Sequence, residues 1–97
     1  MIEFRPTDEF RKWLRGLTDI RAVKNITQRI VRVQAGLLGD AKFFDGIGEL
    51  RVDYGPGYRV YFVRRGNTVI ILLCGGDKGS QDRDIGKARK NGKGSLI

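Results

Sequence analysis

The chain has 97 residues, of which 40% are apolar and 31% charged, so it is expected to fold as one domain with a modest hydrophobic core. Its 19 basic and 11 acidic residues give a net charge of +8, which favours an anionic partner such as nucleic acid, an anionic membrane or an acidic protein. The same charge is also compatible with a role in solubility alone. The absence of histidine excludes His-based triads, His-based general catalysis and His metal sites.

The number of cysteines and the length of the apolar segments indicate the cellular location. The single cysteine, Cys74, excludes an intrachain disulfide and lies in an apolar segment typical of a core. The first residues, MIEFRPTDEF, lack the pattern of a signal peptide, and the longest apolar run of six residues is too short to span a membrane. We therefore expect a cytoplasmic protein that does not contact membranes. The sequence predicts a single domain over residues 1–97, with a flexible tail from about 92 to 97.

The first third of the chain predicts a short strand followed by two helices. Residues 2–4 favour the strand, and Thr7 is a plausible N-cap for a helix that ends at Gly16. A second helix is predicted from Thr18 or Asp19 to about Ala35. Its apolar stripe should pack on the sheet and comprises Ile20, Val23, Ile26, Ile30, Val33 and Leu37. Its other face carries Arg21, Lys24, Arg29 and Arg32, a pattern typical of a solvated surface and alternatively of a rim that follows phosphates.

A glycine-punctuated loop carries Lys42 into the segment from Glu49 to Gly76, which predicts a three-stranded antiparallel meander. With residues 55–57 as the first turn, Leu50, Val52 and Tyr54 would face Phe62, Val60 and Tyr58 on a core face. The opposite, polar face would pair Asp53 with Arg59 and Arg51 with Tyr61. A two-residue turn at Gly66-Asn67 would add Ile70, Leu72 and Cys74 to the polar face. The last strand, apolar at every position from 69 to 74, is expected inside its sheet.

The end of the chain predicts a final helix of marginal stability. Ser80 is a plausible N-cap, acidic residues lie early in the helix, and basic residues lie late. Ile85 and Ala88 are the residues that could be buried, and Gly86 weakens the helix interior. We therefore expect this helix to depend on a partner for its order.

The residues that can carry chemistry are cations on the polar face. The sequence contains no phosphate-binding P-loop or dinucleotide fingerprint, and Glu49 and Asp53 lie too far apart along a strand to share a metal. Arg51, Arg59 and Lys78 could clamp a phosphate, and Tyr61 could stack on a base. A structural interpretation has equal weight, in which Arg59 pairs with Asp53, Arg51 covers Tyr61, and Lys78 is simply solvated.

The order of predicted elements resembles the RelE/ParE superfamily of toxin–antitoxin systems. The segments ELRVDYGPGYRVYF and LLCGGDKGSQDRDI are similar to those of the subfamily called addiction module killer proteins, and the resemblance extends from FRPTDEFRKWL through the last helix. It implies an α+β fold of order β-α-α-β-β-β-α, with an antiparallel sheet packed by two N-terminal helices. It also implies a toxin that cleaves mRNA on the ribosome, as RelE and HigB do, and that is neutralised by a helix-turn-helix antitoxin. Operator DNA would be contacted only through that antitoxin, and no cofactor or metal is implied.

The resemblance also assigns residues. The arginine of the family's YR motif matches Arg59, the basic residue after the last strand matches Lys78, and Arg51 matches a basic position on the preceding strand, so these three are the expected catalytic residues. Contacts to RNA are assigned to Tyr61, Lys42 and Arg83.

The chain departs from RelE in three places. RelE has lysines where Ile47 and Glu49 stand and a functional tyrosine at the position that aligns with Ile85. The general base is therefore open among Lys78, Asp53 and Tyr61. Two alternatives to an endoribonuclease are a DNA gyrase inhibitor of the ParE type and a weakly toxic protein that mainly binds its antitoxin. Because Ile70 and Leu72 are expected on the polar face, an antitoxin segment is expected to cover them.

Overall fold

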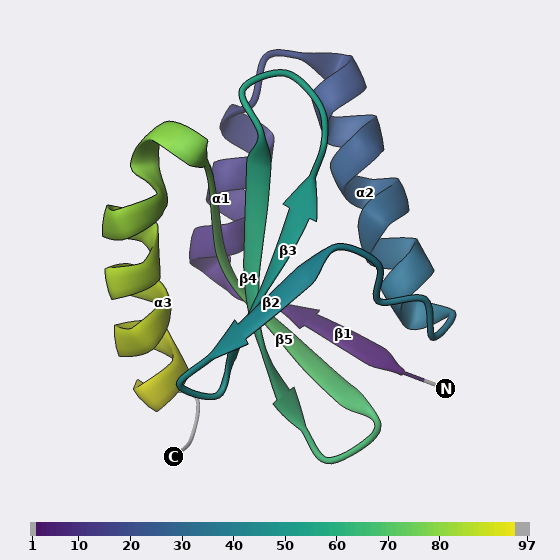
Figure 1. Cartoon of the computed structure of the whole chain (residues 1–97), viewed down its shortest axis with the longest axis vertical. Coiled ribbons are helices and arrows are strands. Elements are labelled where there is room, and N and C mark those ends of the chain that lie inside the picture. The colour runs from purple at the N-terminus through teal and green to yellow at the C-terminus, as the bar shows by residue number, and fades with distance from the viewer. Residues whose placement is uncertain (1, 95–97) are drawn as a thin grey trace.

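The computed structural model describes residues 2–94 and consists of one sheet between two layers of helix (Figure 1). The elements in order are β1 (Glu3–Pro6), α1 (Asp8–Gly16), α2 (Ile20–Gln34), β2 (Ala41–Phe44), β3 (Ile47–Val52), β4 (Tyr58–Arg65), β5 (Val69–Asp77), a 3-10 turn η1 (Lys78–Ser80) and α3 (Gln81–Gly94). The helix α3 extends to Gly94, into the tail predicted from about residue 92, and the last part of that tail (95–97) lies outside the described residues. None of the helices within the described range is long and apolar enough to cross a membrane.

The sheet has five strands in the order β1-β5-β4-β3-β2. The pairs β2–β3, β3–β4 and β4–β5 are antiparallel, whereas β1 pairs with β5 in parallel. The predicted α+β class is confirmed, but the sheet is mixed rather than wholly antiparallel. As predicted, β5 is an internal strand, and its central residues are buried on both faces.

The helices α1 and α2 lie on one face of the sheet, behind it in the view of Figure 1. The predicted N-cap of α1 is confirmed, because the Thr7 hydroxyl accepts a hydrogen bond from the Phe10 amide at 3.1 Å. The same hydroxyl donates to the Leu73 carbonyl at 2.7 Å and so fixes α1 to β5. The core on this face is formed by Phe10, Ile26, Val33, Leu50, Val52, Val60, Phe62, Ile70 and Leu72.

The helix α2 begins after its N-cap Asp19, as predicted, but its faces differ from the prediction at three residues. Ile20 and Leu37, at the two ends of the expected apolar stripe, are 83% and 64% exposed because they extend beyond the sheet. Arg29, expected on the solvated face, is only 8% exposed. Its side chain reaches across to β3 and donates hydrogen bonds to two backbone carbonyls, which compensates for its burial.

The strand β2 was not predicted, since residues 36–48 were interpreted as a loop. Asp45 and Gly46 form the two-residue connection between β2 and β3, and both have positive φ (50° and 77°). An Asp-Gly pair between apolar residues is a strong signal for a tight hairpin, and this signal in the sequence was overlooked. The hairpin extends β3 back to Ile47 and places Lys42 directly opposite Glu49.

The pairing of β3 with β4 differs from the prediction by two residues. Val52 faces Tyr58, Leu50 faces Val60, and Arg51 faces Arg59. The connection therefore spans five residues, 53–57, and Asp53 is not opposite Arg59. The Tyr54 hydroxyl donates to the Asp19 carboxylate at 3.1 Å, so this connection is tied to the start of α2. A shift of two residues preserves the faces, so the predicted core face of this hairpin is confirmed.

The pairing of β4 with β5 corrects the positions of Ile70 and Leu72. Arg65 pairs with Val69, so the turn contains three residues rather than two, and Ile70 and Leu72 lie in the core beneath α1 and α2. An irregularity between Tyr61 and Phe62 in the register then restores Cys74 to the face that carries Tyr61. The expectation that an antitoxin covers Ile70 and Leu72 on the polar face is therefore wrong.

The helix α3 covers the second face of the sheet, on the side opposite α1 and α2 (Figure 1). Ala88 is fully buried, and Ile85 packs against the same cluster. The remaining members of that cluster are Phe44, Ile47, Tyr61, Val63, Ile71, Leu73 and Cys74. An ion pair of 2.8 Å between Arg89 and Asp45 connects the helix to the β2–β3 turn. The helix thus packs on its own sheet through this cluster.

Candidate functional site

The face of the sheet beneath α3 divides into an apolar end and a charged end. Residues directly opposite each other in an antiparallel pair project from the same face. One cross-strand row of the charged end therefore contains Arg51, Arg59 and Gly76, and the next contains Lys42, Glu49, Tyr61 and Cys74. We call Arg51, Arg59, Glu49 and Lys42 the charged row residues.

The two arginines of the charged row residues lie directly opposite each other on β3 and β4. Like charges in this position destabilise a strand pair unless other groups neutralise them. Arg51 has such partners, since its guanidinium lies 3.3 Å from the Glu49 carboxylate and 3.9 Å from that of Asp40. Arg59 forms no ion pair with any side chain that the structure describes, and the predicted pair with Asp53 is absent there.

The Arg59 side chain also has an unsatisfied donor. Its Nε is buried and has no hydrogen-bond partner among the described residues. A buried donor without a partner costs about 1–3 kcal/mol, which proteins usually avoid. A phosphate or carboxylate oxygen could satisfy this donor, because both accept charge-assisted hydrogen bonds from a guanidinium.

Glu49 positions Arg51, and the sequence analysis did not assign it a role. Its side chain is fully buried and accepts hydrogen bonds from Arg51 Nε at 3.3 Å and from Gln81 Nε2 at 3.1 Å. Gln81 is the first residue of α3, so the carboxylate links β3 to the start of that helix. The alternation of charged and apolar residues in β3 could not reveal this burial, because it depends on α3 covering the strand.

The structure corrects the predicted role of Tyr61. Its ring is fully buried beneath α3 and cannot stack on a base, and Glu49 rather than Arg51 is its cross-strand neighbour. Burial, followed by the neighbouring Glu49 carboxylate, raises the pKa of the Tyr61 hydroxyl well above its usual range. The phenol therefore stays protonated at physiological pH, which removes Tyr61 from the candidates for general base.

The other three predicted cations border the same end of the sheet. Lys42 is exposed on the edge strand β2, in the row of Glu49. Lys78 follows Asp77, which pairs with Tyr58, and it lies beside Gly57 in the β3–β4 connection. Lys78 and Arg83 are exposed and line a cavity of about 350 Å³ at the start of α3.

A network of polar side chains fixes the segment that carries Lys78. Asp77 and Ser80 form a capping box around η1, in which the Ser80 amide donates to the Asp77 carboxylate at 3.1 Å and the Asp77 amide donates to the Ser80 hydroxyl at 3.2 Å. The Ser80 hydroxyl also bonds to Asp84, which is 4% exposed. Asp84 packs over Gly76, where a Cβ atom would collide with its carboxylate. Ser80 thus precedes α3 as predicted, but it caps the 3-10 turn together with Asp77.

Comparison with known proteins adds a relative. The chain is 48% identical over 89 residues to an uncharacterized protein of Haemophilus influenzae, and the match covers 91% of this chain and 90% of the relative. The two proteins belong to one family. No family model matches the chain. No solved structure matches it either.

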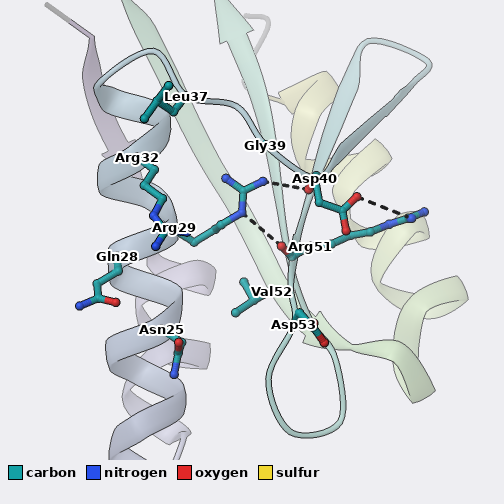
Figure 2. Close-up of a pocket in the computed structure, with 10 residues that line it drawn as sticks. All are labelled: Asn25, Gln28, Arg29, Arg32, Leu37, Gly39, Asp40, Arg51, Val52 and Asp53. Atoms are coloured by element: carbon teal, nitrogen blue, oxygen red, sulfur yellow. Dashed lines mark hydrogen bonds and ion pairs between the residues drawn. The ribbon is translucent and has the colours of Figure 1, made fainter.

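The structure separates the predicted site residues into two groups. Arg51, Arg59 and Lys42 share the charged end of one sheet face, and Lys78 and Arg83 border it from η1 and α3. Asp53, a candidate general base, instead lines a second cavity between α2 and β3 (Figure 2). The described residues form no cluster of three or more Asp, Glu or Cys side chains that could hold a metal ion.

Proposed function

We propose that this protein is the toxin of a type II toxin–antitoxin pair and acts as an endoribonuclease on ribosome-bound mRNA. The observation that carries the proposal is the Arg51–Arg59 pair, in which two arginines lie directly opposite each other on neighbouring strands and Arg59 has a buried donor without a partner among the described residues. Without a ligand, the repulsion between the arginines and the unsatisfied donor are unfavourable. A bound anion would relieve both. A phosphodiester is the anion that the high net positive charge of the chain would also attract.

The cleavage chemistry that fits these residues is attack of a ribose 2′-hydroxyl on the adjacent phosphorus. The new P–O2′ bond forms as the P–O5′ bond breaks, and the additional negative charge on the phosphate oxygens is neutralised by Arg51 and Arg59. One proton leaves O2′ and one must reach O5′. Among the three candidate proton acceptors, Tyr61 is buried and protonated, and Asp53 borders the other cavity. The ammonium group of Lys78, exposed at the charged end, is therefore the proposed proton donor to O5′, and water is the proposed acceptor of the proton that leaves O2′.

Membership of the RelE/ParE superfamily is part of the proposal. It is supported by the order of elements, which follows the expected β-α-α-β-β-β-α with one additional strand, β2. It is also supported by the position of Arg59 and Lys78 at one end of the meander. A partner antitoxin with a helix-turn-helix domain, and a cytoplasmic location, belong to the same proposal.

The test is cleavage of a translated mRNA by purified protein, read by primer extension on assembled ribosomes. We expect wild-type protein to cut the message and Arg59→Ala to reduce the rate about 10²–10³-fold, as for loss of one transition-state donor. Arg64→Ala is the matched control, since Arg64 is an exposed arginine near the far end of the same strand, opposite Ile70. If Arg59→Ala cleaves as fast as wild type, the site assignment is wrong.

Induction in cells separates the alternatives. Loss of amino-acid incorporation before any loss of thymidine incorporation is expected for an endoribonuclease. Induction of the DNA-damage response while protein synthesis continues would instead support a gyrase inhibitor of the ParE type, and the absence of any growth effect would support a protein that mainly binds its antitoxin.

A further inference from the structure

A second cavity, of about 340 Å³, lies between α2 and the end of β3, on the other side of Arg51 from the α3 face (Figure 2). Its walls come from two turns of α2, from the connection that leads into β2, and from the last residues of β3 and the loop after it. The lining residues are Asn25, Gln28, Arg29, Arg32, Leu37, Gly39, Asp40, Arg51, Val52 and Asp53.

The buried Arg29 forms the base of this cavity. Its Nε donates to the Arg51 carbonyl at 3.2 Å, and its Nη2 donates to the Asp40 carbonyl at 2.9 Å. Gly39, with φ of 65°, packs against the guanidinium so closely that a Cβ atom would lie 2.9 Å from Nη2. Two of the three nitrogens are therefore fixed by the backbone. Nη1 has no hydrogen-bond partner in the part of the chain that the structure describes.

The positive charge at the base of the cavity is poorly neutralised. Burial lowers the pKa of Arg29, the nearby Asp40 carboxylate opposes that effect, and Arg32 adds to it. The Asp40 carboxylate is directed towards Arg51, at 3.9 Å, as Figure 2 shows. A rigid, desolvated guanidinium with a spare donor, next to a second arginine, is the arrangement that binds an anionic group with both charge and geometry.

We propose that this cavity binds one acidic side chain of a partner protein, with an apolar residue of the same segment packed on Leu37. Arg29 Nη1 and Arg32 would hold the carboxylate. Leu37 is 64% exposed beside the arginines and would be covered by the apolar neighbour.

The charges around the cavity favour a protein segment over RNA. Asp40 and Asp53 flank the arginines and would repel the closely spaced phosphates of a polynucleotide, whereas a single carboxylate can sit between them. An exposed leucine on the rim adds apolar area, which suits a protein side chain. The inference does not rest on ribonuclease activity, because Arg59 does not line the cavity and the Arg51 backbone carbonyl, which lies in it, is already bound by Arg29.

The experiment uses two peptide probes on the full chain, acetyl-Leu-Glu-Leu-amide and acetyl-Leu-Gln-Leu-amide, with the Nε–H resonance of Arg29 followed by NMR. We expect the Glu peptide to shift this resonance and to bind at least about tenfold more tightly than the Gln peptide, as a charge-assisted hydrogen bond requires. Inorganic phosphate and a short oligouridylate are titrated in parallel.

Two variants keep the test decisive even if Arg29 variants do not fold. Arg32→Gln, at an exposed position, should weaken binding of the Glu peptide several-fold, and Leu37→Ala should weaken both peptides. Arg21→Gln is the matched control, because Arg21 is an exposed arginine of the same helix that does not line the cavity. The proposal is overturned if the Glu peptide does not bind, if it binds no better than the Gln peptide, if Arg32→Gln has no effect, or if phosphate or oligouridylate perturbs Arg29 more strongly.

Discussion

Replacing Arg59 by methionine should stabilise the free protein while abolishing its activity. The guanidinium lies opposite Arg51, has no acidic partner among the described side chains, and leaves its buried Nε without an acceptor. Each of these features costs folding free energy in the absence of a bound anion. Methionine keeps an unbranched apolar stem over the sheet and removes both costs. If Arg59 were retained because it stabilises the fold, the replacement would lower the stability of the protein instead.

The size of the effect follows from the two contributions. An unsatisfied buried donor costs about 1–3 kcal/mol, whereas the repulsion between the two arginines is reduced because Glu49 and Asp40 neutralise Arg51. Because Arg59 as a whole is only partly buried, its other nitrogens reach solvent and the lower end applies, so the gain should be about 1 kcal/mol. For a domain of this size, such a gain raises the Tm by about 4–8 °C.

The assay is thermal unfolding of wild type and Arg59→Met, with and without added phosphate, followed by circular dichroism. Arg64→Met is the control, since it removes an exposed arginine of the same strand and should leave the Tm nearly unchanged. Phosphate should raise the Tm of wild type more than that of Arg59→Met, because binding to the folded state stabilises it. A lower Tm for Arg59→Met than for wild type, or equal stabilisation of both by phosphate, would refute the reasoning.

Three further predictions concern the groups that support this site. Gly76→Ala should destabilise the protein by about 1–3 kcal/mol in urea unfolding, because the new Cβ collides with Asp84, whereas Gly86→Ala, with open space around it, should not. Glu49→Gln should cost about 1–2 kcal/mol and slow cleavage, since Arg51 loses its buried anchor but is still 35% exposed at its side chain and can turn to water. Burial raises the pKa of the Cys74 thiol from 9.0 to about 12, so the stability from burying the neutral thiol is complete below pH 9 and is lost as the pH rises towards 12. Cys74→Ala should flatten that part of the pH–stability curve, and an unchanged curve would contradict this assignment.

The sequence predicted most of the elements because their signals are local. The N-cap Thr7, the end of α1 at Gly16, the start of α2 next to Asp19 and the three strands of the meander all follow from capping residues, glycines and alternation. The two-residue difference in the first hairpin was invisible to alternation, because a shift of two preserves both faces. The Tyr54–Asp19 hydrogen bond, which holds the longer connection, joins residues 35 positions apart in the chain.

In the second hairpin, the apolar pattern of the last strand does not indicate which of its faces packs on the helices. The last strand is apolar at every position from 69 to 74, so its sequence is equally compatible with either face packing on α2. The turn is one residue longer than predicted, and this moves Ile70 and Leu72 into the core. The irregularity further along then returns Cys74 to the α3 face.

The buried polar residues could not be predicted for a related reason. Arg29, Glu49 and Asp84 each lie in a segment whose pattern indicates exposure, yet all three are at most 8% exposed. Each is buried by an element distant in the sequence: Arg29 by the connection at Gly39, Glu49 by the start of α3, and Asp84 by β5 at Gly76. Such burial requires hydrogen-bond partners, which become visible only in three dimensions.

The position at which α3 starts decides how much of the charged end stays open. The helix begins directly after η1, which Asp77 and Ser80 cap, so its apolar residues Ile85 and Ala88 reach the apolar end of the sheet face and stop short of Arg59. Its Gln81 side chain meanwhile fixes Glu49, and Glu49 fixes Arg51. The same helix therefore buries the apolar end of the sheet face and, through Gln81 and Glu49, orients Arg51. Because Gln81, Glu49 and Arg51 form one chain of hydrogen bonds, and Gln81 directly follows the capped turn, changes at the start of α3 should alter the charged end before they alter the core.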